Sequence, residues 1–94
     1  MNLYIVTQFQ FIKNFEKVLK ELGDLNKLEF LILAEETQQQ SEGYKLFFTG
    51  KDVEDYISNK FLPSTDYVLS FNILHIYSDK FIKKLNNRLY NFHS

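Results

Sequence analysis

The sequence contains no cysteine, and this absence excludes several kinds of site at once. Without thiols the chain can form no disulfide, no thiolate metal site and no cysteine nucleophile. Any catalysis must therefore come from imidazole, carboxylate, amide or hydroxyl groups. The two histidines, His75 and His93, are too far apart in the sequence for a helical metal site. We therefore expect no metal cofactor.

The sequence also lacks an excess of basic charge and a long apolar run. Its 11 basic and 12 acidic residues nearly balance, whereas a nucleic-acid-binding surface needs a basic stripe. No run reaches the roughly 18 apolar residues of a membrane span. Met1 to Val6 is followed by polar residues, without a charged leader or a small-residue cleavage site. We therefore expect a cytoplasmic protein with no nucleic-acid or membrane partner.

Glycine is scarce, with three in the chain, and none of them stands in the turn directly after the first apolar run. The turn after that run reads TQFQF, where a dinucleotide-binding fold needs glycines for close approach of the backbone to phosphates. This argues against ordinary NAD or nucleoside triphosphate binding.

The residues that are present describe a single folded domain over residues 1–94. Hydrophobic residues make up 45% of the chain and aromatic residues 17%, which is typical of a globular protein. The run NLYIVT at 2–7 predicts a strand, and FIKNFEKVLKELG at 11–23 has the spacing of an amphipathic helix that ends at Gly23. The apolar run KLEFLILA at 27–34 predicts a strand covered on both faces.

The second half of the chain repeats this alternation after a polar loop, EETQQQSEG at 35–43. The remaining elements are predicted as a strand at 44–50, a helix capped by Thr49 and ended by Pro63, a buried strand at 66–71, a helix capped by Ser78 over 78–87, and a final strand within 88–94. Short joints between strands and helices favour right-handed parallel crossovers. The prediction is an α/β fold, a Rossmann-like three-layer α/β/α sandwich with a mostly parallel sheet.

The final strand, RLYNFHS, brings two polar side chains together. Side chains two residues apart in a strand share a face, so Asn91 and His93 point the same way. The carboxyl ends of strands are where α/β proteins hold their ligands. Asn91 and His93 are therefore the candidate catalytic residues.

From Asp66 onward the chain reads DYVLSFNILHIYSDKFIKKLNNRLYNFHS, and this stretch resembles the central part of the formyltransferase family. That family includes methionyl-tRNA formyltransferase, glycinamide ribonucleotide transformylase and the sugar N-formyltransferases. The shared features are an Asp that opens a buried strand, a small residue and an aromatic at its end, an apolar loop, a short helix, and a strand that ends in Asn-x-His. Over residues 1–65 the likeness is architectural.

The resemblance implies a reaction and a site. Asn91 and His93 fall on the family's active-site Asn and His, and the donor would be 10-formyltetrahydrofolate. The acceptor would be a small amine, for which we favour a nucleotide-linked amino sugar because the chain has no basic surface for tRNA. An amide donor and an imidazolium suit the oxyanion that forms when an amine attacks the formyl carbon. Phe71 and the loop after it, with Leu74 and Ile76, would form the wall for the pteridine ring.

The chain departs from the family's pattern after His93. A Leu-Pro loop and a later catalytic Asp follow in the family, whereas this sequence ends at Ser94. The expectation is a domain truncated after the Asn-x-His strand, with little or no turnover by itself. A sheet that ends there would expose an apolar edge, a site for homo-oligomerisation or another association.

Two alternatives remain open at this stage. A formyltetrahydrofolate hydrolase of the same family uses a similar pair of residues with water as the nucleophile. A non-catalytic α/β module could use the sheet edge to dimerise or to find a partner. For the other polar residues we expect structural roles. His75 is expected at a partly buried loop position, and Asp66 is expected to orient the start of its strand. The lysines of 78–87 and Arg88 are expected to form a solvated helix face.

Overall fold

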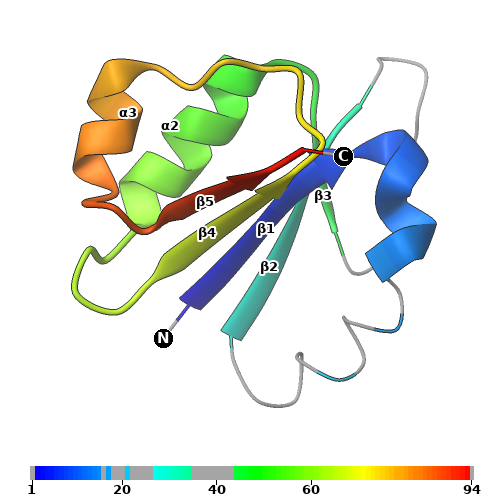
Figure 1. Cartoon of the computed structure of the whole chain (residues 1–94), viewed down its shortest axis with the longest axis horizontal. Helices are drawn as coiled ribbons and strands as arrows, with labels where there is room; N and C mark the ends of the chain where they lie inside the picture. Colours follow the sequence, from blue (N-terminus) through cyan, green and yellow to red (C-terminus); the bar gives the residue numbers. More distant parts are fainter. Residues whose placement is uncertain (1, 16, 18–20, 22–26, 35–43, 94) are drawn as a thin grey trace.

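The computed structural model describes residues 2–15, 17, 21, 27–34 and 44–93. In this part of the chain five strands form one all-parallel sheet in the order β3-β2-β1-β4-β5 (Figure 1). The elements in chain order are β1 (Asn2–Gln8), the 3-10 helix η1 (Phe9–Phe15), β2 (Lys27–Leu33), β3 (Lys45–Phe47), α2 (Gly50–Lys60), β4 (Tyr67–Phe71), α3 (Asp79–Lys84) and β5 (Leu89–Phe92). The predicted α/β fold with a parallel sheet is confirmed.

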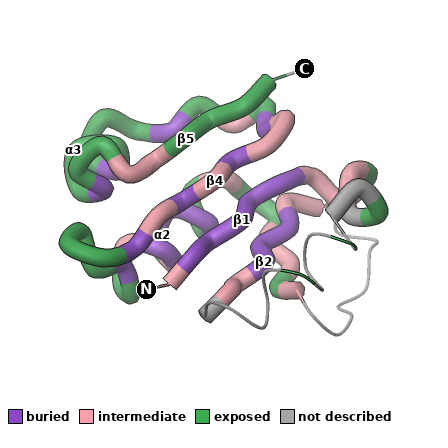
Figure 2. Tube along the Cα trace, turned by 60° about the horizontal axis from the view of Figure 1, so that its bottom comes forward, coloured by how far each residue is buried: buried purple, intermediate pink, exposed green. Residues whose placement is uncertain are grey.

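The centre of the sheet is formed by the apolar runs. β1 lies between β2 and β4, with Ile5 opposite Phe30 on one side and Leu69 on the other. In β2, Leu31 and Ile32 are fully buried on opposite faces, as the continuous apolar run predicted. Figure 2 shows the contrast between β1, which is buried along most of its length, and the exposed edge strand β5.

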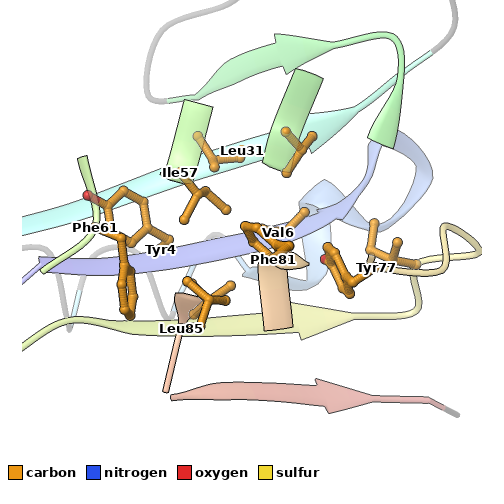
Figure 3. Packing of buried hydrophobic residues seen from close by; sticks show 11 residues of the cluster. Tyr4, Val6, Leu31, Ile57, Phe61, Tyr77, Phe81 and Leu85 are labelled. Carbon is orange, nitrogen blue, oxygen red and sulfur yellow. The ribbon is translucent and has the colours of Figure 1, made fainter. Parts of the chain in front are cut away.

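The helices α2 and α3 cover one face of the sheet (Figure 1). Thr49 caps α2, because its hydroxyl accepts a hydrogen bond from the Asp52 amide at 3.1 Å. Ser78 caps α3 in the same way, through the Phe81 amide at 3.2 Å. The larger core lies beneath these helices (Figure 3) and consists of Tyr4, Val6, Leu31, Val53, Ile57, Phe61, Val68, Ile73, Tyr77, Phe81 and Leu85.

The opposite face has a smaller core, in which Leu3, Ile5, Phe30 and Ile32 are buried and Phe9 packs against them from the start of η1. The helix predicted at 11–23 begins as a 3-10 helix, a common geometry at the start of a helix. Lys17 and Glu21 are helical, and the other positions after Phe15 lie outside the described residues, as does the predicted loop at 35–43.

Two predicted elements are clearly shorter than expected. The strand expected at 44–50 spans only Lys45–Phe47, because Thr49 already caps α2, which begins at Gly50. The helix expected over 78–87 ends at Lys84, because Asn86 and Asn87 adopt positive φ angles of 49° and 65°. Asparagine tolerates this left-handed conformation better than most residues, and it ends the helix before the turn into β5.

The strand order contains one change of direction. From β1 the chain adds β2 and β3 on one side, and it then crosses to add β4 and β5 on the other. This change of direction makes a topological switch point between β1 and β4, where open α/β sheets bind ligands at the carboxyl ends of the strands. Among the described residues, no helix has the length and apolar character to cross a membrane.

Candidate functional site

Asn91 and His93 lie beside one groove, which we call the main groove. Asn91 pairs with Ser70 of β4, so its side chain shares a face with Leu89, on the side of the sheet that α3 covers. The groove has a volume of about 430 Å³ and an opening toward solvent. Its lining residues are Ile73, Leu74, His75, Ile76, Tyr77, Ile82, Asn87, Leu89, Asn91 and His93.

The structure therefore brings together four of the five residues that the sequence singled out. Leu74 and Ile76 are 85% and 89% exposed, and they line the groove together with Asn91 and His93. Apolar side chains with this exposure form a wall on which a flat ring could lie.

Phe71 does not join them. Its side chain lies on the opposite face of the sheet from Ser70 and stacks on Phe92, with ring centroids 5.0 Å apart. The strand alternation that directs Asn91 into the groove directs Phe92 away from it. Phe71 can therefore support the position of β5, but it does not line the main groove.

A second, smaller hollow adjoins the main groove at the switch point. It has a volume of about 260 Å³ and is lined by Gln8, Gln10, Phe11, Asn72, Ile73, Leu74 and His93. The hydroxyl of Thr7 donates a hydrogen bond to the carbonyl of Phe71 at 2.9 Å, which holds the ends of β1 and β4 together here. His93 and the Ile73–Leu74 pair border both spaces.

The loop 73–78 forms the wall of the main groove, and Glu54 of α2 anchors it. One carboxylate oxygen of Glu54 lies 2.6 Å from Nε2 of His75, and the other accepts hydrogen bonds from the hydroxyl and the amide of Ser78, at 2.5 and 3.3 Å. Burial acts to raise the pKa of Glu54, but the hydrogen bonds from Ser78 and His75 outweigh it and lower the pKa. Glu54 is therefore held as a carboxylate.

His75 is a packed loop residue, as its apolar neighbours in the sequence suggested. Its ring rests against Gly50, where an added Cβ would lie 2.0 Å from Nδ1, and it meets the Tyr77 ring edge-on at 5.3 Å. Nε2 of His75 is thus engaged by Glu54, and Nδ1 lies on the side of the ring that faces Gly50. His93 is exposed and, within the described part of the chain, has no polar partner, so it is the histidine available for chemistry.

The sequence reasoning missed Glu54 and Gly50. Glu54 precedes Ile57 by three residues and Phe61 by seven, so it lies on the apolar face of α2. A carboxylate on an apolar helix face was the available signal, because such a group is buried only when it has partners. Nothing in the sequence indicates that Gly50 contacts His75.

Asp66 has the structural role that the sequence suggested. It is fully buried and accepts hydrogen bonds from the amides of Asn2 and Leu62, both at 2.9 Å, and from the hydroxyl of Thr65 at 3.1 Å. These contacts join the starts of β1 and β4, at the edge opposite the groove. Across the described ranges, no three His, Asp or Glu side chains converge in a way that could hold a metal ion.

The remaining basic residues named from the sequence are spread over the surface. Lys80, Lys83 and Lys84 of α3 are exposed. Arg88 packs over the Tyr67 ring at 4.6 Å and donates a hydrogen bond to the Ser64 carbonyl at 3.3 Å. None of these residues lines the main groove.

Comparison of the chain with protein-family models, with curated proteins and with solved structures found no match.

Proposed function

We propose that this chain is part of a formyltransferase that moves a formyl group from 10-formyltetrahydrofolate to an amine. In this proposal the domain is a Rossmann-like three-layer sandwich, and Asn91 and His93 are its catalytic residues. The observation that carries the proposal is the position of both side chains in one groove with Leu74 and Ile76, at the carboxyl ends of parallel strands.

The two spaces around His93 suit a reaction with two substrates. The main groove has an apolar wall for the pteridine ring of the donor. The smaller hollow carries the amide side chains of Gln8 and Gln10, which can hydrogen-bond to a polar acceptor. A nucleotide-linked amino sugar is our preferred acceptor. His93 borders both spaces, so it is the residue beside which formyl carbon and amine nitrogen would meet.

In the proposed reaction the amine nitrogen attacks the formyl carbon and a tetrahedral oxyanion forms. The Asn91 amide and a protonated His93 donate hydrogen bonds to that oxyanion, an arrangement worth about 3 to 4 kcal/mol per donor in other enzymes. The bond from the formyl carbon to N10 of the folate then breaks, and N10 takes a proton that His93 can supply. The products are the formamide and tetrahydrofolate.

The attacking amine must lose a proton, and among the described residues that line the two spaces there is no Asp or Glu to accept it. We therefore expect the 94-residue chain to bind the donor and to turn over very little. Rapid formyl transfer by the purified chain would contradict this part of the proposal.

Calorimetry with 5-formyltetrahydrofolate, a stable formylated reduced folate, tests the donor site. We expect the wild-type chain to bind it, and Asn91→Ala and His93→Ala to weaken binding. Asn59→Ala is the matched control, because Asn59 is an exposed amide on α2 that does not line the groove. Absence of binding, or binding that neither groove variant changes, would contradict the proposal. Release of formate from 10-formyltetrahydrofolate in the absence of an amine would instead identify the related hydrolase.

One observation favours the alternative of an association module. Tyr90 and Phe92, both 48% exposed, lie with Tyr67 and Phe71 on the face of β5 and β4 away from the groove. Exposed aromatics on an edge strand are typical of a surface that pairs with another chain. Sedimentation velocity decides between the two functions. A concentration-dependent dimer that Phe92→Asp abolishes, in a chain that binds no folate, would favour the module.

A further inference from the structure

Glu54 links helix α2 to the wall of the main groove through contacts that use both carboxylate oxygens. Its side chain is 11% exposed, and it faces Nε2 of His75 with one oxygen and Ser78 with the other. A carboxylate this buried is costly unless its hydrogen-bond capacity is filled, and here three donors fill it.

The loop 73–78 depends on these side-chain contacts, because its own backbone forms few hydrogen bonds. Within the described part of the chain, the backbone N–H and C=O groups of residues 73–77 form no hydrogen bond with another backbone group. Ile73 and Tyr77 anchor the two ends of the segment in the core, and His75 anchors its middle to Glu54. Leu74 and Ile76, which alternate with these anchors, project into solvent at the groove.

We propose that Glu54 is a positioning residue for the main groove. Acting through His75 and Ser78, it holds the loop 73–78 so that Leu74 and Ile76 face Asn91 and His93 before a ligand arrives. A wall that is already ordered spares the ligand the cost of ordering it, and so strengthens binding. The identity of the ligand rests on the proposed function, whereas the ordering of the loop does not.

The variant Glu54→Gln separates positioning from simple packing. Glutamine keeps the size of the side chain but removes the charge and puts an NH2 group where one of the acceptor oxygens was. If the NH2 group faces His75, the Nε2 atom must be unprotonated in order to accept a hydrogen bond from it. If the NH2 group faces Ser78, the hydroxyl and amide of Ser78 lose their acceptor. Asp55→Asn is the matched control, because Asp55 is an exposed carboxylate on the same helix and the variant removes the same charge.

¹⁵N NMR of the histidine rings measures the effect of this variant on the contact between His75 and residue 54. The assignment is simple, because His75 and His93 are the only histidines in the chain. With Glu54→Gln we expect the ¹⁵N shifts of the His75 ring to change and those of His93 to stay. The backbone amide order parameters should fall across residues 73–78 but not in β1, because the loop loses its anchor to α2. With Asp55→Asn none of these should change. Unaltered ¹⁵N shifts of the His75 ring together with unaltered order parameters in the loop would overturn the proposal.

The affinity for 5-formyltetrahydrofolate is the second measurement. Loss of a charge-assisted anchor predicts binding about tenfold weaker in Glu54→Gln than in Asp55→Asn. Equal affinities in the two variants would overturn the positioning role. If the wild-type chain binds no folate, the proposed function fails, and the order parameters alone still decide whether Glu54 orders the loop. Should Glu54→Gln not fold, His75→Ala removes the same anchor from the other side, because alanine has no donor for the Glu54 carboxylate, and it is judged by the same order-parameter criterion.

Discussion

The hydroxyls of Ser70 and Tyr77 lie 2.7 Å apart in the interior and join the end of β4 to the loop before α3. Both residues are buried, and the Tyr77 ring stacks on Phe81 with centroids 5.2 Å apart. Burial raises the pKa of Tyr77, more than its hydrogen bond with Ser70 lowers it. Tyr77 is thus a neutral hydrogen-bonding group that fixes one end of the groove wall.

Tyr77→Phe should lower the free energy of unfolding by about 1 to 3 kcal/mol, because the Ser70 hydroxyl would be left buried without its partner. The double variant Ser70→Ala with Tyr77→Phe removes both hydroxyls and should recover part of that loss. Urea denaturation measures both effects. A single variant as stable as the wild type would show that the Ser70 hydroxyl finds another partner.

Gly50→Ala should destabilise the chain, although alanine normally stabilises a helix relative to glycine. The new Cβ would lie 2.0 Å from Nδ1 of His75, so the ring and its bond to Glu54 must shift. Overpacking of this kind costs about 1 to 3 kcal/mol in unfolding free energy. The clash disappears in His75→Ala, so in that background Gly50→Ala should be neutral or stabilising. Additive effects in this cycle would rule out the contact.

Asp66 should make the chain sensitive to acid. Burial acts to raise its pKa, but the hydrogen bonds from the Asn2 and Leu62 amides and from Thr65 prevail and lower it. A carboxyl whose pKa is lower in the folded state stabilises the fold above the unfolded pKa of about 3.9, and this stability is lost as the pH falls through the folded value.

The variant Asp66→Asn tests this linkage. Its unfolding free energy should be lower than that of the wild type at pH 7 by about 1 to 3 kcal/mol, and it should fall less steeply as the pH is reduced below the unfolded value. Asp55→Asn, which alters an exposed carboxylate, serves as the control. Equal slopes for wild type and Asp66→Asn would mean that other carboxyls dominate the acid transition.

Tyr56 should contribute to a loss of stability at alkaline pH. Its hydroxyl donates to Glu29 and accepts from Nζ of Lys60 at 2.8 Å, and burial followed by the bond to Glu29 raises its pKa. A raised folded pKa favours the neutral phenol, so this contribution is complete below the unfolded pKa of about 10 and is lost as the pH rises through the folded value. In Tyr56→Phe the free energy of unfolding should fall less steeply as the pH rises from neutral to alkaline, as measured by urea denaturation at a series of pH values. A decline as steep as in the wild type would assign it to Tyr77 or Tyr4, whose pKa values are also raised.

The helix caps and the strand alternation were predictable because they depend on local sequence. Thr49 and Ser78 cap helices through amides three residues away, and Asn91 and His93 share a face because strand side chains alternate. Leu74 and Ile76 were assigned to the same site only through the resemblance to the formyltransferases, and they line one groove with Asn91 and His93. The early end of α3 was missed, because the φ angles of Asn86 and Asn87 depend on how the chain must turn into β5.

The amino-acid sequence alone determined the alternation of strands and helices, the parallel sheet and the approach of Asn91 to His93, since each follows from periodicity and short joints. Tertiary structure alone decided that Phe71 faces away from the groove, that Gly50 supports the ring of His75, and that Glu54 anchors the groove wall. These contacts join residues 21 or more positions apart, and such pairs form only when packing brings separate elements together. The apolar face of α2 marks Glu54 as a residue that needs partners, but no local pattern in the sequence identifies the partner in any of these contacts, because no local energy depends on it.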